Sequence, residues 1–526
     1  PDTWEFETTE ELTEFSGILG QPRATEALDF GLSIEQPGYN IYVAGDTGSG
    51  RIRYVQDFLR RRVSHQQTPL DWLYVNNFDN PLEPRAISLP PGQGSQLRRD
   101  IDQLIDALLD TFPATFDNPS FQQRNSVVQS RFDQLYDVAI TTVKHAAAER
   151  QVSMYHEDGS VTFTPMVEGK VLDDAQFANL DSNAMDAFQH QVEQLEALLN
   201  EVLLDLPTWQ RDLNDQLRQL REDTINHALK PLLQPLRQSY QGSPAVTLYL
   251  AQIVNHLPRV IEEHFDDQEK NNTDTPSQQR RLLESFYRPN LLCSTSKGGA
   301  PVVLESNPSY SNLFGSVSYG GEDAGAAFQQ ISPGALHRAN GGYLIIDIEK
   351  LLSSDAPWAA LKRMLRDGCI HTEPPPGEIQ ISGTAPLRPE AIPLSVKVIL
   401  IGPREIYYTL DQIDRDFNEL FHVLVDFEGR FNSDRTTLPR FADLLHSRAR
   451  EARIAELSAA AVARLTEHSH RLADHQRRLS ARIDVIMEVA VEADFQRQRA
   501  GTKIIEVGHI EQAIAAQRHR NARLND

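Results

Sequence analysis

The sequence predicts an α/β core joined to all-helical parts, and three observations carry this prediction. A short apolar run at 40–44 leads through the glycine-rich turn GDTGSGRI (45–52) into a segment with helical spacing of apolar residues. Residues 97–285 are poor in glycine and repeat apolar residues three and four positions apart. Strand patterns then return and give way to a mainly helical end. We therefore expect a parallel sheet, interrupted by a long, coiled-coil-like helical insertion and followed by a small helical domain.

The composition is that of a large acidic chain. It has 526 residues, of which 40% are hydrophobic, and a formal net charge of −23. This length allows roughly two to four domains, and the acidic balance argues against a general surface for nucleic acid or anionic membranes. Cys293 and Cys369 stand far apart without the spacing of a zinc site, and no apolar run approaches ~18 residues. We expect a cytoplasmic protein without a metal centre, a membrane contact or a nucleic-acid partner.

Segment 1–96 is expected to form the first part of the core. Residues 20–34 place apolar side chains on one helical face, and 53–63 repeat them at the same spacing. A strand at 72–75 precedes a connection that proline and glycine punctuate. Strand, glycine turn and helix together indicate an α/β unit.

Segment 97–285 is expected to form a helical arm. Apolar residues over 192–220 predict a long helix with a kink at Pro207. A similar pattern over 128–146 offers an antiparallel partner. Two short β-rich runs within 152–166 predict a hairpin. A helical arm tipped by this hairpin is one outcome, and an ordinary helical bundle packed on the core is the alternative.

The rest of the chain returns to the α/β pattern and ends in helices. The polar stretch 265–280 is predicted as a linker or loop. The second part of the core is expected over 286–436, and a small helical domain over 437–526. Three further strands are expected at 300–305, 342–348 and 396–402.

The turn GDTGSGRI has the glycines of a phosphate-binding loop but not its usual ending. The backbone N–H groups for phosphate oxygens would come from Gly45, Gly48, Ser49 and Gly50. A lysine for the β- and γ-phosphates and a hydroxyl for Mg²⁺ normally follow. Arg51 keeps the positive charge in a different geometry, and Ile52 cannot ligate a metal. The loop can hold phosphate but is poorly equipped for hydrolysis, and a turn used only for packing is the alternative.

The second half of such a site is an acidic residue at the end of a neighbouring strand. In GGYLIIDIEKL (341–351), Asp347 follows an apolar strand and fits this role. Glu349 could orient an attacking water only if the strand has already ended there, since strand alternation would put it on the face of Asp347. An acidic helix cap is the alternative for Glu349. Where a polar sensor is expected after the next strand, the sequence has Gly402. The hydrolytic positions therefore look altered together.

Four longer stretches carry a family resemblance. They are the opening GILGQPRATEALDFGLSIEQPGYNIYVAGDTGSGR, GAPVVLESNPSYSNLFGSV (299–317), GALHRANGGYLIID (334–347) and PLSVKVILIGPREIYYTLDQIDRDFNELFHVLVDFE (393–428). Together they resemble the AAA+ module of Lon-like ATP-dependent proteases, in the branch where a large helical insertion separates Walker A from Walker B. The resemblance covers nearly the whole chain. It implies a ring-forming ATPase, usually a hexamer, that feeds unfolded protein to a C-terminal Ser-Lys peptidase domain. No peptidase domain is evident in this sequence.

The resemblance also implies roles for individual residues. Gly45, Gly48, Gly50 and Arg51 correspond to Walker A, and Asp347 to Walker B. Arg482 resembles the sensor-2 arginine of the C-terminal helical lid, and a solvated helix residue is its alternative. Arg415 and Arg430 flank DFNELFHVLVDFEG, but neither stands clearly where the family has its arginine finger.

The resemblance further places pore-lining aromatic residues before Walker B. The candidates are Tyr310, Phe314 and Tyr319, and Phe314 is equally compatible with a core position. The S-x-x-K string at 294–297 lies in a polar loop, and we do not expect it to be catalytic.

Two functional hypotheses follow. The first is a substrate-recognition and unfoldase module of a Lon-like protease whose nucleotide site is degenerate. ATP or ADP would then bind weakly, Mg²⁺ binding is in doubt, and hydrolysis would be impaired. The second is a ring or scaffold protein without hydrolysis that binds protein partners through the helical arm. In either case we expect a homo-oligomeric ring, a hexamer in this family, that binds unfolded or specific proteins. A DNA-associated regulator is a weaker reading because the chain is acidic.

Overall fold

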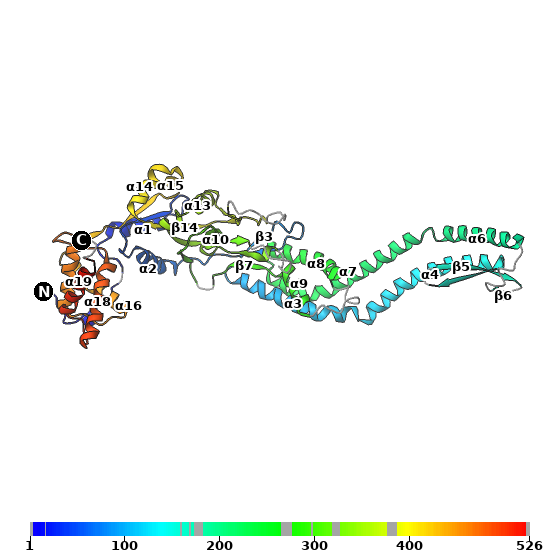
Figure 1. Ribbon diagram of the computed structural model, residues 1–526, viewed down its shortest axis with the longest axis horizontal. Coiled ribbons are helices and arrows are strands. Elements are labelled where there is room, and N and C mark those ends of the chain that lie inside the picture. The colour runs from blue at the N-terminus through cyan, green and yellow to red at the C-terminus, as the bar shows by residue number, and fades with distance from the viewer. Residues whose placement is uncertain are drawn as a thin grey trace. The chain divides into compact units, whose positions relative to one another are not determined.

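The computed structural model divides the chain into two compact units (Figure 1). The core unit comprises Pro1–Arg99 and Ser285–Asp526, and the arm unit comprises Asp100–Glu284. The structure describes residues 4–521 apart from 16, 158–159, 168–169, 173–181, 265–275, 296–297, 318–326 and 376–386.

The core unit is built on a five-stranded sheet in the order β15-β1-β14-β11-β8. Its strands are β1 (Ile41–Ala44), β8 (Val302–Glu305), β11 (Gly342–Asp347), β14 (Val396–Gly402) and β15 (Val423–Asp426). Every neighbouring pair is parallel, so the carboxyl ends of the strands meet at one edge of the sheet. The parallel-sheet core predicted from the sequence is confirmed.

Helices cover both faces of this sheet because its strands are apolar on both sides. Ile41 of β1 packs with apolar residues of α1 (Pro22–Ser33) and α2 (Arg51–Val63) on one face. The next residue, Tyr42, packs into a second cluster with α13 (Asp355–Asp367) on the other face. The alternation of strand side chains therefore creates two cores with the sheet between them.

A smaller antiparallel sheet in the core unit holds both ends of the inserted segment. Its order is β3-β2-β7, with β2 (Asp71–Val75), β3 (Arg85–Leu89) and β7 (Asn290–Cys293). The helix α3 (Gln93–Phe116) follows β3, and α9 (Pro276–Tyr287) precedes β7.

The linker predicted over 265–280 is wrong in its last five residues. Pro276 begins α9 there, at the first helical position where a missing N–H costs no hydrogen bond. The remainder, 265–275, lies outside the described residues.

The arm unit consists of long helices and a three-stranded antiparallel sheet. Its main helices are α4 (Pro119–Glu149), α6 (Ser182–Val202), α7 (Leu206–Ser239) and α8 (Pro244–His264). α4 packs against both α6 and α7 (Figure 1). β4 (Val152–Glu157) pairs with β5 (Ser160–Val167), which confirms the predicted hairpin, and β6 (Lys170–Val171) adds a third strand. Val143, Met154 and Leu195 share a small buried core at this sheet.

The predicted kink at Pro207 is instead a complete break. The chain leaves the helical conformation at 203–205, between α6 and α7. Pro207 lies in the first turn of α7, where it removes no intrahelical hydrogen bond. Pro231 and Pro235 lie inside the same helix.

The C-terminal helices form a lid with a core of its own. They are α16 (Thr437–Ala452), α17 (Ala459–Leu472), α18 (Ile483–Ala500) and α19 (Val507–Asn521). Phe441, Leu465 and Ile486 belong to one buried cluster at their centre. We keep residue 437 as the proposed start of this domain. Nowhere in the described part of the chain is a helix both long and apolar enough to cross a bilayer.

Candidate functional site

Three of the predicted site elements meet at the carboxyl edge of the parallel sheet. The glycine loop (45–50) follows β1, Asp347 ends β11, and Gly402 ends β14. The strand register sets Ala44 beside Gly402 and Asp347 beside Ile401. Ligands of open α/β sheets bind outside this edge, so these elements lie together where such a fold binds its ligands.

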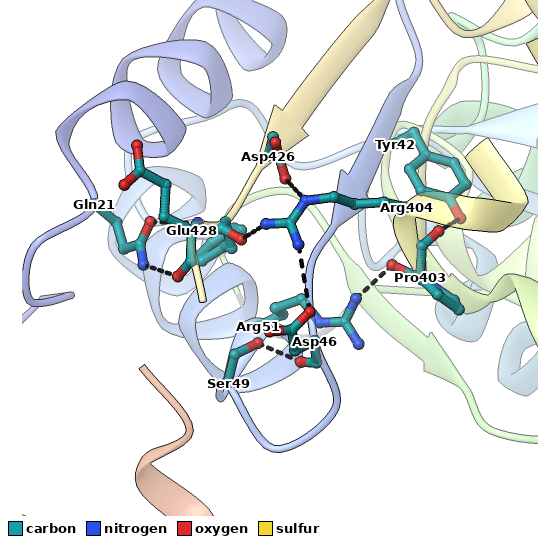
Figure 2. Close-up of polar contacts among 11 residues, drawn as sticks. Gln21, Tyr42, Asp46, Ser49, Arg51, Pro403, Arg404, Asp426 and Glu428 are labelled. Atoms are coloured by element: carbon teal, nitrogen blue, oxygen red, sulfur yellow. Dashed lines mark hydrogen bonds and ion pairs between the residues drawn. The ribbon is translucent and has the colours of Figure 1, made fainter. Parts of the chain in front are cut away.

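The glycine loop has a backbone that only glycine adopts readily. Gly45, Gly48 and Gly50 have φ angles of 154°, 81° and 71°. The Ser49 hydroxyl donates to the Asp46 carbonyl over 2.7 Å and closes the turn (Figure 2). Gly50 caps α2, so the free N–H groups of the first helical turn face the loop. The loop thus retains the geometry that attracts an anion.

Arg51 does not extend freely from this loop. Its Nη1 donates to the Gly402 carbonyl at the end of β14 (Figure 2). Burial lowers the pKa of the guanidinium, and the nearby Tyr42, Asp46 and Asp347 partly offset this effect. The cation in the lysine position of the motif is therefore bonded to the strand end where a polar sensor had been expected.

Gly402 occupies that strand end for a steric reason. A Cβ atom at this position would lie 2.2 Å from Cγ2 of Ile348 and 2.7 Å from the hydroxyl oxygen of Tyr42. Both neighbours are fully buried, and the Tyr42 hydroxyl donates to the Pro403 carbonyl over 2.8 Å. No side chain of any polarity fits at position 402 without displacing them.

Asp347 ends its strand and caps the short helix α12 (Ile348–Leu351). Its Oδ1 accepts from the backbone N–H groups of Glu349, at 3.0 Å, and Lys350, at 3.5 Å. The strand has therefore ended before Glu349, which is the condition set above for Glu349 to act, and the Glu349 side chain is exposed. The cap that was the alternative for Glu349 is formed by Asp347 instead.

Sequence reasoning missed Arg404, which ties the loop to two strand ends. Its Nε lies 2.6 Å from Oδ1 of Asp426, and its Nη1 lies 3.3 Å from Oδ1 of Asp46. Nη2 donates to the Phe427 carbonyl (Figure 2). In the sequence, the only sign of this role is a cation two residues after Gly402. Its three partners lie on other segments of the chain, so the local sequence does not reveal them.

The lid contacts the glycine loop through its backbone. The Asp484 N–H donates to the Gly48 carbonyl over 3.3 Å, and the Ala481 N–H donates to the Gly429 carbonyl over 2.9 Å. Arg482 lies between these two contacts at the start of α18, and its side chain is exposed. Its backbone is therefore beside the loop, and its role as sensor 2 stays a prediction.

The pore-lining assignment needs correction for two of its three residues. Tyr310 and Phe314 stack edge to face within α10 (Tyr310–Phe314) and both lie in the main core cluster. Side chains buried in this way present nothing to a substrate, so the core alternative holds for Phe314 and extends to Tyr310. Tyr319 lies outside the described residues.

The other residues singled out above are accounted for separately. In the S-x-x-K string, the Ser294 hydroxyl donates to the buried Asp71 over 3.2 Å, and Lys297 lies outside the described residues. Arg415 and Arg430 are exposed. Among the described residues, no group of three or more His, Cys, Asp or Glu side chains is arranged to hold a metal ion.

Family models match three parts of the chain. A LonB-like AAA domain matches residues 298–428, and the lid domain of archaeal LonB AAA+ ATPases matches 456–520. The helical domain of Lon-like LonC matches 71–104. An AAA domain implies nucleotide binding.

A curated relative and two solved structures add to this comparison. A putative Lon protease homolog of Escherichia coli (strain K12) is 31% identical over 93 residues, which span 17% of this chain and only 14% of that protein. NtrX from Brucella abortus in complex with ATP is 14% identical, with a TM-score of 0.27 over 44% of this chain and 46% of that one. A full-length MCM homolog of Methanopyrus kandleri is 19% identical, with a TM-score of 0.17 over 41% and 43%. At such TM-scores these structures support no conclusion about this chain.

The matched domains and the geometry agree on one assignment. The glycine loop and Asp347 lie on the parallel sheet. In the sequence the helical arm separates them, and the matched lid domain follows the last strand of the sheet. The chain is a Lon-like AAA+ module.

Proposed function

We propose that this chain is the substrate-recognition and unfoldase module of a Lon-like protease whose nucleotide site binds ATP or ADP but hydrolyses ATP weakly or not at all. The observation that carries the proposal is the hydrogen bond from Arg51 to the Gly402 carbonyl. In a working loop the residue at this position reaches the β- and γ-phosphates. Here its cation is already engaged by the protein.

Binding is supported by what the loop keeps. The left-handed glycines lead the loop into the start of α2, whose first N–H groups have no partner within the helix. This arrangement needs no lysine to attract a phosphate. Hydrolysis is disfavoured by what the site lacks. Ile52 offers no hydroxyl to Mg²⁺, and position 402 has no room for a polar sensor.

Asp347 is the carboxylate that would meet the Mg²⁺ of a bound nucleotide. Magnesium in such sites takes one or two carboxylates together with phosphates and water, and it would neutralise charge on the phosphates. Oδ1 of Asp347 already accepts two N–H groups. Only Oδ2 of Asp347 therefore remains for Mg²⁺, and Ile52 offers no second protein ligand.

Calorimetric titration with ADP and with ATP plus Mg²⁺, paired with a phosphate-release assay, tests the proposal. We expect nucleotide binding without phosphate release. The double variant Arg51→Lys/Ile52→Thr should also release no phosphate, because Gly402 is unchanged. Arg60→Lys, an exposed position on the same helix, is the matched control. Release by the unaltered chain would refute the impaired-hydrolysis part. Absence of nucleotide binding would contradict the binding part of the proposal and leave the AAA+ fold with a structural role only.

We further propose a homo-oligomeric ring, a hexamer, that binds unfolded or specific proteins. The support is the family itself, since AAA+ proteins typically assemble as rings. Light scattering on the purified chain with and without ADP measures the assembly. A monomer under both conditions would contradict the ring.

The alternative of a scaffold that binds partners through the arm also has an observation in its favour. Val127 and Val138 of α4 are 65% and 68% exposed. Exposed aliphatic side chains on one helix suit contact with apolar segments of another protein. In the full chain, Val127→Ser/Val138→Ser should weaken binding of a reduced, carboxymethylated polypeptide and leave ADP binding unchanged. Unaltered polypeptide binding would place recognition elsewhere.

A further inference from the structure

We infer that Arg404 enables the glycine loop to accept a phosphate by pairing with the loop's own carboxylate, Asp46. The inference rests on the proposed nucleotide site and adds a positioning residue to it. Arg404 begins α14 (Arg404–Ile413), directly after the end of β14. It acts through Asp46 and does not itself contact the phosphate.

The glycine loop carries a negative charge where a ligand of the same sign would bind. Asp46 is the second residue of GDTGSGRI, and its side chain is 49% exposed. Because Asp46 belongs to the loop, a phosphate held by the loop's N–H groups would lie close to its carboxylate, and like charges repel. An unpaired Asp46 would therefore weaken phosphate binding.

Other acidic side chains around the loop add to this repulsion. The carboxylates of Asp46, Asp347 and Glu349 all act on the charge of Arg51, so they outnumber that cation. Asp484 of the lid, whose N–H donates to the loop, adds a further exposed carboxylate. The loop therefore depends on a cation from elsewhere to offset its own acid.

The arginines at the start of α2 and on α16 do not supply that cation. Arg53 lies 3.9 Å from Asp57 and also pairs with Glu451, and Arg448 pairs with the same Glu451 over 3.2 Å. Two carboxylates thus balance two guanidinium groups. In the part of the chain that the structure describes, the one ion pair of Asp46 is with Arg404.

The guanidinium of Arg404 is held in place from a third segment. Its Nε lies 2.6 Å from Oδ1 of Asp426, and its Nη2 donates to the Phe427 carbonyl. These two contacts fix the plane of the group, since its donors form a rigid fork. Nη1 is thereby directed at Oδ1 of Asp46, 3.3 Å away (Figure 2). Asp426 shares the charge of Arg404, so Asp46 is compensated in part.

The pair also keeps the Asp46 carboxylate off the loop's own donors. An aspartate in a turn readily accepts the backbone N–H two residues further on, and such a bond would occupy a donor that a phosphate needs. Among the described residues, the Asp46 carboxylate accepts from Arg404 and from no loop N–H. Its Oδ2 lies 2.5 Å from the place that a Cβ on Gly429 would take. The carboxylate is therefore confined between Arg404 and the backbone at 429.

Titration of the full chain with ADP tests whether Arg404 acts through Asp46. We expect Arg404→Gln to weaken ADP binding by about threefold to tenfold. The double variant Arg404→Gln/Asp46→Ala should bind within about twofold of the unaltered chain, because the acid that needs compensation is gone. Arg404→Lys should lose less than Arg404→Gln, since it keeps the charge without the fork.

Arg62→Gln is the matched control. Arg62 lies in the last turn of α2, is 30% exposed and pairs over 2.6 Å with Asp29, which is 59% exposed; the corresponding values for Arg404 and Asp46 are 29% and 49%. This variant should bind ADP like the unaltered chain. If Arg404→Gln also does so, or if the double variant is as weak as Arg404→Gln alone, the inference is overturned and the proposed function stands.

Pyrophosphate separates this inference from the proposed function. At constant ionic strength it should raise the thermal unfolding midpoint of the unaltered chain, of Arg62→Gln and of the double variant, and raise that of Arg404→Gln less. Each shift is measured against the same variant without ligand, so a loss of stability alone does not alter it. If ADP fails to bind while pyrophosphate gives this pattern, nucleotide binding falls and the inference stands. An equal response of all variants to pyrophosphate, including none, overturns the inference.

Discussion

Replacing Gly402 by alanine tests the steric argument at the centre of the site. The added Cβ would meet Ile348 and Tyr42 at 2.2 and 2.7 Å, and both side chains are fully buried. Overpacking of this kind costs about 1–3 kcal/mol. Displacing the Tyr42 hydroxyl from the Pro403 carbonyl removes a buried hydrogen bond worth about 1 kcal/mol. The expected total is about 2–4 kcal/mol.

Native-state hydrogen exchange measures this loss where it occurs. The free energy of opening should fall for amides of β11 and β14. Gly508→Ala on α19 is the control, since a Cβ there meets nothing within 4 Å. Gly402→Ala combined with Ile348→Ala should lose less than the sum of the single variants, because Ile348→Ala removes the nearer clash. A Gly402→Ala chain within about 0.5 kcal/mol of the unaltered protein would refute the reasoning.

Two further predictions concern other parts of the chain. Burial lowers the pKa of His337 to about 4, so between pH 6.5 and 4 the unfolded chain binds a proton that the folded chain does not. The free energy of unfolding should therefore decrease as the pH is lowered through this window, by up to ~3 kcal/mol. It should vary less with pH in His337→Gln, and an equal slope in that variant would contradict the assignment. Leu195→Ala should remove about 2–5 kcal/mol from the arm core, seen as faster hydrogen exchange in β4 and β5 with ADP binding unchanged, whereas faster exchange in β1 would show that the units are not independent.

Local patterns in the sequence were enough to place the glycine loop and Asp347 at one edge of the sheet, but not to describe their contacts. The glycine loop and Asp347 are each defined by residues a few positions away, an apolar strand before and a turn or helix after. Their meeting at one edge follows from parallel strands. The hairpin was predictable for the same reason, since its two strands are consecutive in the chain.

Contacts between distant segments were not predictable from one sequence. Arg404 looks like an ordinary surface arginine in the sequence, because its partner Asp46 on the glycine loop lies hundreds of positions away. Gly402 looked like a lost sensor, but its neighbours Ile348 and Tyr42 supply the steric reason. Phe314 is a similar case, since its sequence is equally compatible with a pore and a core position, and only the surrounding core decides between them.

The small sheet β3-β2-β7 has a consequence for how such a chain can change over time. The strand before the arm and the strand after it pair with the two edges of β2, and both run antiparallel to it. They are therefore parallel to each other, with the end of β3 beside Asp71 and the start of β7 beside Tyr74. Gain, loss or exchange of the segment Asp100–Glu284 would leave every core strand with its partner, provided that a crossover connection of about a dozen residues or more still joins β3 to β7. The arm can therefore be exchanged as a unit, and natural variation or protein engineering can alter its length and its tip without redesigning the nucleotide-binding core.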